Sequence, residues 1–485
     1  MILSKPTQFD RNLIVIGAGS AGLVSSIIAA AVNAKITLIE KHKMGGDCLN
    51  TGCVPSKALI KSAKIASLIK RSNEFGINVA ESNIDFAAVM ERIQSIIKKI
   101  EPHDSVERFE GLGVECIEGT ATITSPWSVE INKKTLTAKN IIVATGAGPF
   151  VPPIKGIEDI DYLTSDNLWE IRDQPKRLVV LGGGPIGCEL SQAFARLGSS
   201  VTQVEMAPRI MAREDEDVSA LITEKFIHEG VDVRTNHKAK EFIIRDNKNI
   251  LICEYDGQDV EIEFDSLLVA VGRKPNTSGF GLDELGVELN NNKTIKVNEY
   301  LQSSVPSIYA CGDVAGPYQF THTAAHQAWY ASVNTLFGRF KRFKADYSVI
   351  PWATFTDPEV ARVGLNEQDA KQQNIPYEIS LFQLDELDRA LTDEETEGFV
   401  KVLTVPGKDK ILGATIVGDH AGELITEYIT AMKNKTGLNK ILGTIHIYPT
   451  LSEANKYAAG VWKKANAPQF LLKLVGKYHK WSLKH

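Results

Sequence analysis

The sequence predicts an α/β fold with two doubly wound parallel sheets, one nested inside the other. Two segments share one pattern: a short apolar strand, a glycine-rich turn, a helix, and a second strand closed by a glutamate. The copies are evenly offset, since 182 − 17, 187 − 22 and 205 − 40 all equal 165. Two later runs, IIVATG at 141–146 and LLVAVG at 267–272, have the continuous apolar character of strands buried on both faces of a parallel sheet.

Length and composition limit what this chain can be. Its 485 residues suffice for two to four domains at roughly 100–200 residues each. With 24% charged and 43% hydrophobic residues, extensive disorder and a polytopic membrane protein are excluded. The 54 basic and 60 acidic residues leave no overall basic surface for nucleic acid. Six cysteines are too few for a disulfide-stapled scaffold and indicate a reducing, cytoplasmic location.

The first glycine turn reads GAGSAG and predicts a dinucleotide site. Gly17 permits the tight turn, Gly19 lets a pyrophosphate approach the backbone, and Gly22 allows close helix packing. The N-H groups at the start of the following helix can bind phosphate, and Glu40 can accept hydrogen bonds from a ribose. The second turn, GGGPIG, repeats this unit with Glu205 as its closing acid. A lone motif is weak evidence, but two complete units predict two dinucleotide sites.

Cys48 and Cys53 stand apart from the other cysteines in the segment GGDCLNTGCVPSK. They are five residues apart with Gly52 between them, so a loop that curls back would let them form a disulfide. Pro55 and the apolar pattern after it predict a helix that begins just after Cys53 and lowers the pKa of a thiolate there. The alternative is a pair of small buried side chains, which is also the expectation for Cys116, Cys188, Cys253 and Cys311.

This segment, between two glycine units, resembles the FAD-dependent class I pyridine nucleotide-disulfide oxidoreductases, which include mercuric reductase and dihydrolipoamide dehydrogenase. The stretches SIYACGDVAG and FTDPEVARVG extend the resemblance from about Asn12 to Trp462. It implies that NADH reduces FAD, which reduces a Cys48-Cys53 disulfide. It also implies that Cys48 exchanges with substrate, that Cys53 faces the flavin, and that Lys57 and Glu189 form an ion pair near the flavin.

The resemblance implies a homodimer and a division into domains. We expect two nested Rossmann-like domains, one binding FAD (1–152 and 281–350) and one binding NAD(P) (153–280). An α+β dimerisation domain (351–465) and a basic amphipathic tail (466–485) would follow them. For the nicotinamide, a carboxylate at Glu205 accepts from a ribose 2′-hydroxyl and repels a 2′-phosphate, which favours NADH over NADPH. Arg209, four residues later, would weaken this preference.

The predicted cofactor contacts come from the two motifs and the resemblance together, and no metal-ligand set is predicted. Those for FAD are Gly17, Gly19, Ser20, Ala21, Gly22, Glu40, Lys41, Gly46, Thr145, Gly146, Gly312 and Asp313. Those for the nicotinamide nucleotide are Gly182, Gly184, Ile186, Gly187, Glu205 and Gly272.

The C-terminal stretch HIYPTLSE departs from the disulfide reductases of this family. Tyr448 stands where a histidine base is expected, and Glu453 matches the carboxylate that orients the base. A phenol with a reference pKa near 10 is a poor base at neutral pH. Mercuric reductases are similar in carrying tyrosine here, but they usually end in a cysteine pair, whereas the last cysteine of this chain is Cys311.

Three interpretations therefore stay open. The first is a mercuric reductase-like flavoenzyme that acts on a thiol-bound metal ion or a small-molecule disulfide. The second is a dihydrolipoamide dehydrogenase in which His446 replaces the missing base. The third is a redox-sensing or electron-delivery flavoprotein that serves a protein partner.

The C-terminal tail carries a separate signal. No acidic residue follows Glu453, whereas lysines accumulate. Leu471, Leu474, Val475 and Tyr478 fall at i, i+3, i+4 and i+7, which predicts an amphipathic basic helix. This helix either rests on an anionic membrane surface or packs on its own dimer with its lysines in water.

Overall fold

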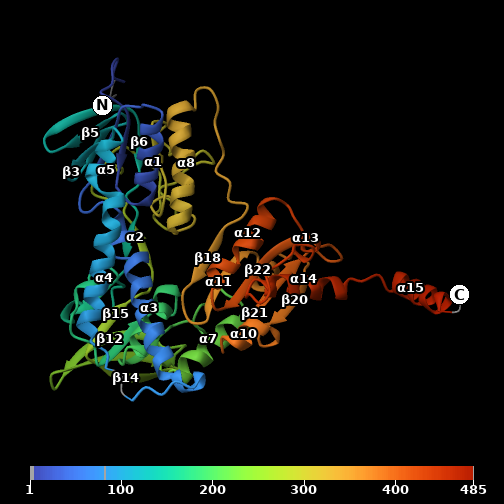
Figure 1. The fold of residues 1–485 in the computed structure, drawn as a ribbon. Coiled ribbons are helices and arrows are strands. Elements are labelled where there is room, and N and C mark those ends of the chain that lie inside the picture. Colours follow the sequence, from blue (N-terminus) through green and yellow to red (C-terminus); the bar gives the residue numbers. More distant parts are fainter. Residues whose placement is uncertain (1–4, 81–82, 484–485) are drawn as a thin grey trace. The chain divides into compact units, whose positions relative to one another are not determined.

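The computed structural model describes residues 5–80 and 83–483, and these residues form two compact units. The first unit lies within Met1–Ile210 and Phe226–Asp346, and the second within Met211–Lys225 and Tyr347–His485. Figure 1 shows the elements of both units along the chain. The predicted α/β class with two parallel sheets is confirmed. Among the described residues, no helix is both long and apolar enough to cross a membrane.

The first parallel sheet is buried on both faces. Its central strand contributes Leu13 and Val15 to one hydrophobic cluster and Ile14 and Ile16 to another, and none of the four is more than 7% exposed. The parallel strands are β3 (Glu115–Glu118), β2 (Ile36–Glu40), β1 (Arg11–Ile16) and β6 (Lys134–Val143), in that order, with β17 (Ile308–Ala310) also parallel to β6. Beyond β6 the sheet continues with two antiparallel strands, β5 (Ser128–Ile131) and β4 (Thr122–Ser125). Helices α1 (Ser20–Ala31) and α8 (Thr321–Phe337) pack together against the first cluster.

The second parallel sheet repeats the same local order of strand, turn, helix and strand. Its order is β11 (Asp232–Arg234), β10 (Ser200–Val204), β9 (Arg177–Leu181), β15 (Ser266–Val269) and β8 (Tyr162–Leu163), with α6 (Pro185–Arg196) after the turn. An antiparallel sheet of β12 (Lys238–Arg245), β13 (Lys248–Tyr255) and β14 (Gln258–Phe264) follows. Strands β7 (Ala147–Pro149) and β16 (Arg273–Pro275) pair as an antiparallel ribbon. The segment before the second parallel sheet is therefore hydrogen-bonded to the segment after it.

The described residues between β2 and β3 include the α-helices α2 (Gly46–Asn50), α3 (Cys53–Lys70), α4 (Phe86–Ile100) and α5 (Val106–Gly111). The helix predicted to begin just after Cys53 begins at Cys53 itself. It packs against α4 and against α6 of the second glycine unit. The cysteine segment therefore lies in contact with the helix of the second glycine unit.

The second unit contains an antiparallel sheet backed by helices. The strand order is β18 (Pro351–Thr354), β19 (Glu359–Gly364), β22 (Ile411–Gly418), β21 (Phe399–Thr404) and β20 (Glu378–Gln383). The helices are α9 (Glu367–Gln372), α10 (Asp388–Thr392), α11 (Ala421–Leu424), α12 (Thr426–Lys433), α13 (Leu438–Leu442), α14 (Glu453–Ala465) and α15 (Gln469–Ser482). Val400, Ile416, Tyr428 and Ala458 are fully buried in its core.

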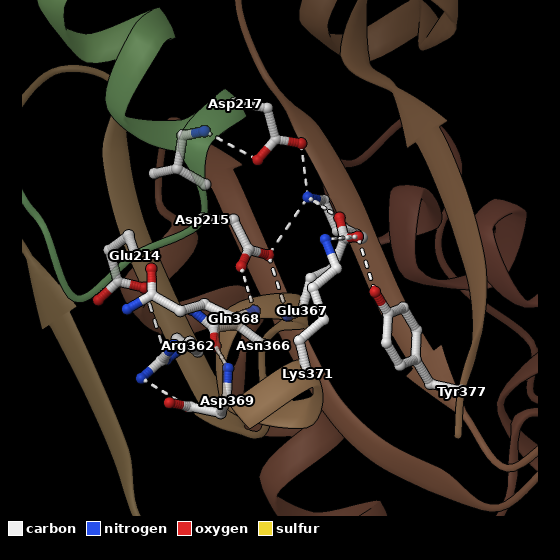
Figure 2. A network of polar contacts seen from close by, with 12 residues as sticks. Glu214, Asp215, Asp217, Arg362, Asn366, Glu367, Gln368, Asp369, Lys371 and Tyr377 are labelled. Carbon is white, nitrogen blue, oxygen red and sulfur yellow. Dashed lines mark hydrogen bonds and ion pairs between the residues drawn. The ribbon is translucent and has the colours of Figure 1, made fainter. Parts of the chain in front are cut away.

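Residues 211–225, which include the start of α7 (Glu216–His228), belong to this second unit, although the sequence places them inside 153–280. The reason is electrostatic. The Lys401 side chain is 2% exposed, and its ammonium lies 3.3 Å from Asp215 and 2.9 Å from Glu367 and also pairs with Asp217. A buried ammonium needs carboxylate partners, and two of these three come from the inserted segment (Figure 2).

Replacing this buried lysine tests how strongly the segment is held. We expect Lys401→Met to lower the free energy of unfolding by about 3 kcal/mol, because it leaves a buried carboxylate at Asp215 without its cation. The matched control is Lys371→Met, since Lys371 is 68% exposed and pairs with the same Glu367. Denaturant unfolding should show little change for the control, and equal losses for both variants would contradict this account.

Candidate redox site

The two glycine turns have the same backbone geometry. Gly17 has φ +101° and Gly182 has φ +118°, a region that side chains rarely adopt. A Cβ at Gly17 would overlap the carbonyl oxygen of Ala144, and one at Gly182 would overlap that of Ala270. Glycine is therefore required at both turns, and the chain spacing of the two motifs reflects a repeated structure.

Each closing glutamate holds its own turn. Glu40 Oε2 accepts a hydrogen bond from the Ala18 amide at 2.6 Å, and Glu205 Oε2 accepts one from the Gly183 amide at the same distance. The second oxygen of each carboxylate accepts from the amide two residues later, at 2.9 Å and 2.7 Å. The sequence suggested only a ribose contact for these acids. The 165-residue offset also relates Ala18 to Gly183, so it could have indicated that each glutamate binds the backbone of its own turn.

The start of each helix leaves space where a pyrophosphate would lie. Among the described residues, a Cβ at Gly19 would meet only the Gly46 Cα, at 3.9 Å, and a Cβ at Gly184 would meet nothing within 4 Å. These two glycines cap α1 and α6, and neither helix has a side-chain cap. First-turn N-H groups beside an open glycine fit a phosphate group.

The remaining predicted cofactor residues lie near the carboxyl ends of the parallel strands, where ligands bind in such sheets. Thr145 and Gly146 follow β6, and Gly312 and Asp313 follow β17. A Cβ at Gly46 would lie 2.7 Å from the Gly19 Cα, so the cysteine segment rests directly on the first turn. The others lie at the two turns, in the first turns of α1 and α6, or just after β2 and β15: Ser20, Ala21, Gly22, Lys41, Ile186, Gly187 and Gly272.

Asp313 lies beside a cation that the sequence did not identify. Its carboxylate is 3.6 Å from Arg273 Nε, and burial raises the pKa of Asp313 to about 6. Arg273 also pairs with Asp47, the neighbour of Cys48 in the chain. Arg273 Nε is buried and makes no hydrogen bond within the described residues. A polyhydroxyl chain such as the ribityl group of FAD fits beside this carboxyl and guanidinium.

Cys48 and Cys53 are not joined by a disulfide in this structure. A hydrogen bond between them shifts their pKa values in opposite directions. The thiol of Cys48 hydrogen-bonds Cys53, and this bond is the main reason that the pKa of Cys53 falls to about 6. The same bond, with burial, raises the pKa of Cys48 well above its ordinary value. The hydrogen bond therefore favours the thiolate at Cys53 over the thiolate at Cys48.

Two further groups stabilise the Cys53 thiolate. The hydroxyl of Thr321, in the first turn of α8, lies 3.4 Å from Cys53 Sγ, and the charge of Lys57 also lowers the pKa of Cys53. The direction predicted from the helix start is correct, but the main cause is the neighbouring thiol. Thr321 was missed because it is 268 residues from Cys53 along the chain.

The predicted pairing of Lys57 with Glu189 is confirmed. Lys57 Nζ lies 2.8 Å from Glu189 Oε2, and Glu189 is only 6% exposed. The lysine comes from α3 and the glutamate from α6, so the pair joins the cysteine helix to the second glycine unit. The alternative of two separate solvated charges does not hold.

The other cysteines differ in burial. Cys188, Cys253 and Cys311 are fully buried, as expected. The expectation is wrong for Cys116, which is only partly buried because it lies on β3 at the edge of its sheet.

Tyr448 and Glu453 lie together in the second unit. They line a cavity of about 270 Å³ with Phe382, Glu386, Leu387, Asp388 and Tyr457. The Tyr448 hydroxyl donates to Asp388 Oδ2 at 3.0 Å, and this bond raises the pKa of Tyr448. The phenol is therefore neutral at physiological pH. Asp388 lies 60 residues before Tyr448 in the chain, and no sequence motif marked it.

His446 does not join this cavity. Its Nε2 lies 3.0 Å from Glu427 Oε1, its Nδ1 lies 3.1 Å from the Thr444 carbonyl oxygen, and its side chain is 6% exposed. Both ring nitrogens are thus engaged within the fold. The structure gives no support to His446 as a replacement base.

Comparison with known proteins identifies relatives along nearly the whole chain. Residues 11–328 match the family described as pyridine nucleotide-disulphide oxidoreductase, and residues 350–459 match the dimerisation domain of that family. A mercuric reductase of Bacillus cereus is 34% identical over 462 residues, which cover 95% of this chain and 73% of that protein. A dihydrolipoyl dehydrogenase of Chlamydia pneumoniae is 37% identical over 469 residues, covering 95% and 98%.

A solved structure shares the fold. The Cu(II) complex of the HOCl-induced flavoprotein disulfide reductase RclA from Escherichia coli superposes with a TM-score of 0.82 at 25% identity, covering 92% of this chain and 98% of that one.

The Thr321 contact gives a direct test of the thiolate environment. We expect Thr321→Val to raise the pKa of Cys53 by about one unit, because a hydrogen bond to a charged group is lost. Alkylation of Cys53 would then become fast only at higher pH, as measured by rate against pH in the reduced enzyme. Thr321→Ser keeps the hydroxyl and should behave like the parent. Identical profiles for the valine and serine variants would show that the hydroxyl does not act on Cys53.

Proposed function

Because the chain belongs to the pyridine nucleotide-disulphide oxidoreductase family, we propose that it is an NADH-dependent flavoenzyme that reduces a thiol-reactive acceptor through Cys48 and Cys53. The family acts with FAD and NAD(P)H on sulfur groups or mercuric ion. The observation that carries the proposal is the thiol pair with pKa values shifted in opposite directions, in a segment whose Gly46 lies against the first glycine turn and whose Lys57 pairs with Glu189. We also propose a cytoplasmic location, from the sparse cysteines.

FAD, when bound, supplies two-electron transfer between the nicotinamide and the cysteine pair. The protein provides the rest. Gly17, Gly19 and Gly22 shape the phosphate site, and Lys57 supports the negative charge on Cys53. With a disulfide acceptor, the Cys48 thiol must lose its proton before its sulfur attacks. That attack breaks the S–S bond of the acceptor, forms a mixed disulfide between Cys48 and one acceptor sulfur, and releases the other acceptor sulfur as a thiolate. The Cys53 thiolate then attacks Cys48 Sγ, which forms the Cys48-Cys53 bond and releases the second acceptor sulfur as a thiolate.

We propose that the acceptor is a soft, thiol-bound metal ion. A disulfide acceptor needs a base for Cys48 and an acid for the departing thiolate, and the neutral phenol of Tyr448 is poorly suited to the first task. A soft metal ion binds thiolates directly and itself favours loss of the thiol proton.

The dimerisation domain supports a homodimer. We propose that the Tyr448 cavity completes the partner subunit's redox site, where its carboxylates favour a cation.

An acceptor screen tests this proposal. The FAD-loaded enzyme is supplied with NADH and, separately, with mercuric ion in excess thiol, lipoamide or oxidised glutathione. We expect sustained NADH oxidation with the metal, lost in Cys48→Ala and in Cys53→Ala. Tyr448→His restores a group with a pKa near neutrality, so it should raise lipoamide reduction about tenfold or more. Rapid lipoamide turnover by the unaltered enzyme would contradict the metal proposal and favour dihydrolipoamide dehydrogenase.

Failure with every small acceptor, together with normal reduction of Cys48 and Cys53 by NADH, would instead favour electron delivery to a protein partner. The reduced enzyme should show a thiolate-to-flavin charge-transfer band that is lost in Cys53→Ala. A normal band in that variant would contradict the assignment of Cys53 to the flavin face.

We further propose NADH as the donor, because the Glu205 carboxylate closes the second turn at the position that meets the ribose. Glu205→Ala should narrow the ratio of kcat/KM for NADH over NADPH by about tenfold, since a hydrogen bond to the 2′-hydroxyl and a repulsion of the 2′-phosphate are both lost. Glu40→Ala is the matched control, because Glu40 makes the equivalent contacts at the first turn. It should weaken FAD retention and leave the ratio unchanged. An unchanged ratio in Glu205→Ala would remove this basis for NADH.

A further inference from the structure

The C-terminal helix α15 (Gln469–Ser482) presents an apolar face that its own unit does not cover. None of its residues is buried. The exposed fraction is 72% for Phe470, 53% for Leu471, 45% for Leu474 and 49% for Val475. Buried helices of the same unit contrast with it: in α14, Ala454, Ala458 and Trp462 pack into the hydrophobic core. The location of α15 at the C-terminal end is seen in Figure 1.

The apolar and basic side chains of α15 form two separate stripes. At about 100° per residue, the apolar side chains fall within an arc of about 200°. They are Phe470, Leu471, Leu472, Leu474, Val475, Tyr478 and Trp481. Lys473, Lys477 and Lys480 fall within an adjacent arc of about 60°. This is the pattern of a helix that lies in a membrane interface, with apolar residues toward the acyl chains and lysines at the headgroups.

The chain from Ala454 onward carries basic residues and no acidic ones. No aspartate or glutamate occurs from Ala454 to the C-terminus, although the whole chain has a net charge of −6. Lys463 and Lys464 occupy the last turn of α14, immediately before the linker to α15. A cluster of lysines beside an amphipathic helix is complementary to anionic lipid, and each lysine near the surface strengthens binding.

The length and the aromatic residues favour a helix that lies on the membrane over one that crosses it. The helix has 14 residues, whereas a span needs about 20. Tyr478 and Trp481 pack with their ring centroids 6.1 Å apart near the C-terminal end of α15. Aromatic side chains of this kind are enriched at the depth of the lipid headgroups.

We propose that α15 binds the surface of an anionic lipid bilayer and holds this oxidoreductase at the membrane as a peripheral protein. This inference does not depend on the identity of the acceptor. Its consequence is that the enzyme works next to the bilayer, where acceptors that are lipid-soluble or released by membrane proteins are concentrated.

Co-sedimentation of the full-length, FAD-loaded protein with vesicles tests the proposal. One set of vesicles is phosphatidylcholine alone, and the other contains phosphatidylglycerol as well. We expect pelleting with the anionic vesicles only, and less of it at high salt. Replacing Lys473, Lys477 and Lys480 together by Gln should lower the partition coefficient about a hundredfold. Equal binding to both vesicle types, or none to either, would overturn the proposal.

Two further variants separate membrane binding from misfolding and from a subunit contact. Leu474→Glu places a charge in the apolar stripe and should abolish pelleting, while Phe340→Glu, at an exposed phenylalanine of the other unit, should not. Both should keep NADH-dependent activity in solution. Truncation after Ala467 should also abolish pelleting and leave the dimer intact in lipid-free sedimentation velocity. If the truncation dissociates the dimer, or leaves pelleting unchanged, α15 is not the membrane-binding element and the proposal fails.

Discussion

The first unit depends on a constraint that occurs twice: a glycine at positive φ whose turn is closed by a glutamate from the end of the next strand. The turn leaves no room for a Cβ at Gly17 or Gly182, and it leaves space at Gly19 and Gly184. In the first copy this geometry also supports the cysteine segment, because Gly46 lies against Gly19. The same few backbone contacts thus shape the first glycine turn and hold the cysteine segment beside it.

The pKa values of Cys48 and Cys53 differ because the two side chains are hydrogen-bonded to each other. A single hydrogen bond lowers the pKa of Cys53 and raises that of Cys48. Thr321 and Lys57 reinforce the thiolate, and Glu189 opposes it while anchoring the lysine. The negative charge is therefore favoured on Cys53, and the proton on Cys48. Under the proposed function with a disulfide acceptor, removal of that proton is the step for which the neutral phenol of Tyr448 is poorly suited.

The second unit is specialised through charge. Lys401 holds residues 211–225 by their carboxylates, Asp388 keeps the phenol of Tyr448 protonated, and Glu427 engages His446. The C-terminal helix α15 is basic, because it carries lysines and no aspartate or glutamate. A cavity lined by carboxylates and a basic amphipathic helix are thus separate features of one domain.

Much of this protein was determined by local sequence. The glycine turns, the buried strands and the cysteine pair were predicted, because turns and strands depend on neighbouring residues. The pairing of Lys57 with Glu189, which are 132 residues apart, was implied by the family resemblance alone. Only the tertiary structure decided the contacts of Thr321, Arg273 and Asp388. It also placed residues 211–225 in the second unit and paired His446 with Glu427, outside the Tyr448 cavity. Each depends on side chains brought together from distant parts of the chain, where burial and charge pairing select the partner and no local pattern records the choice.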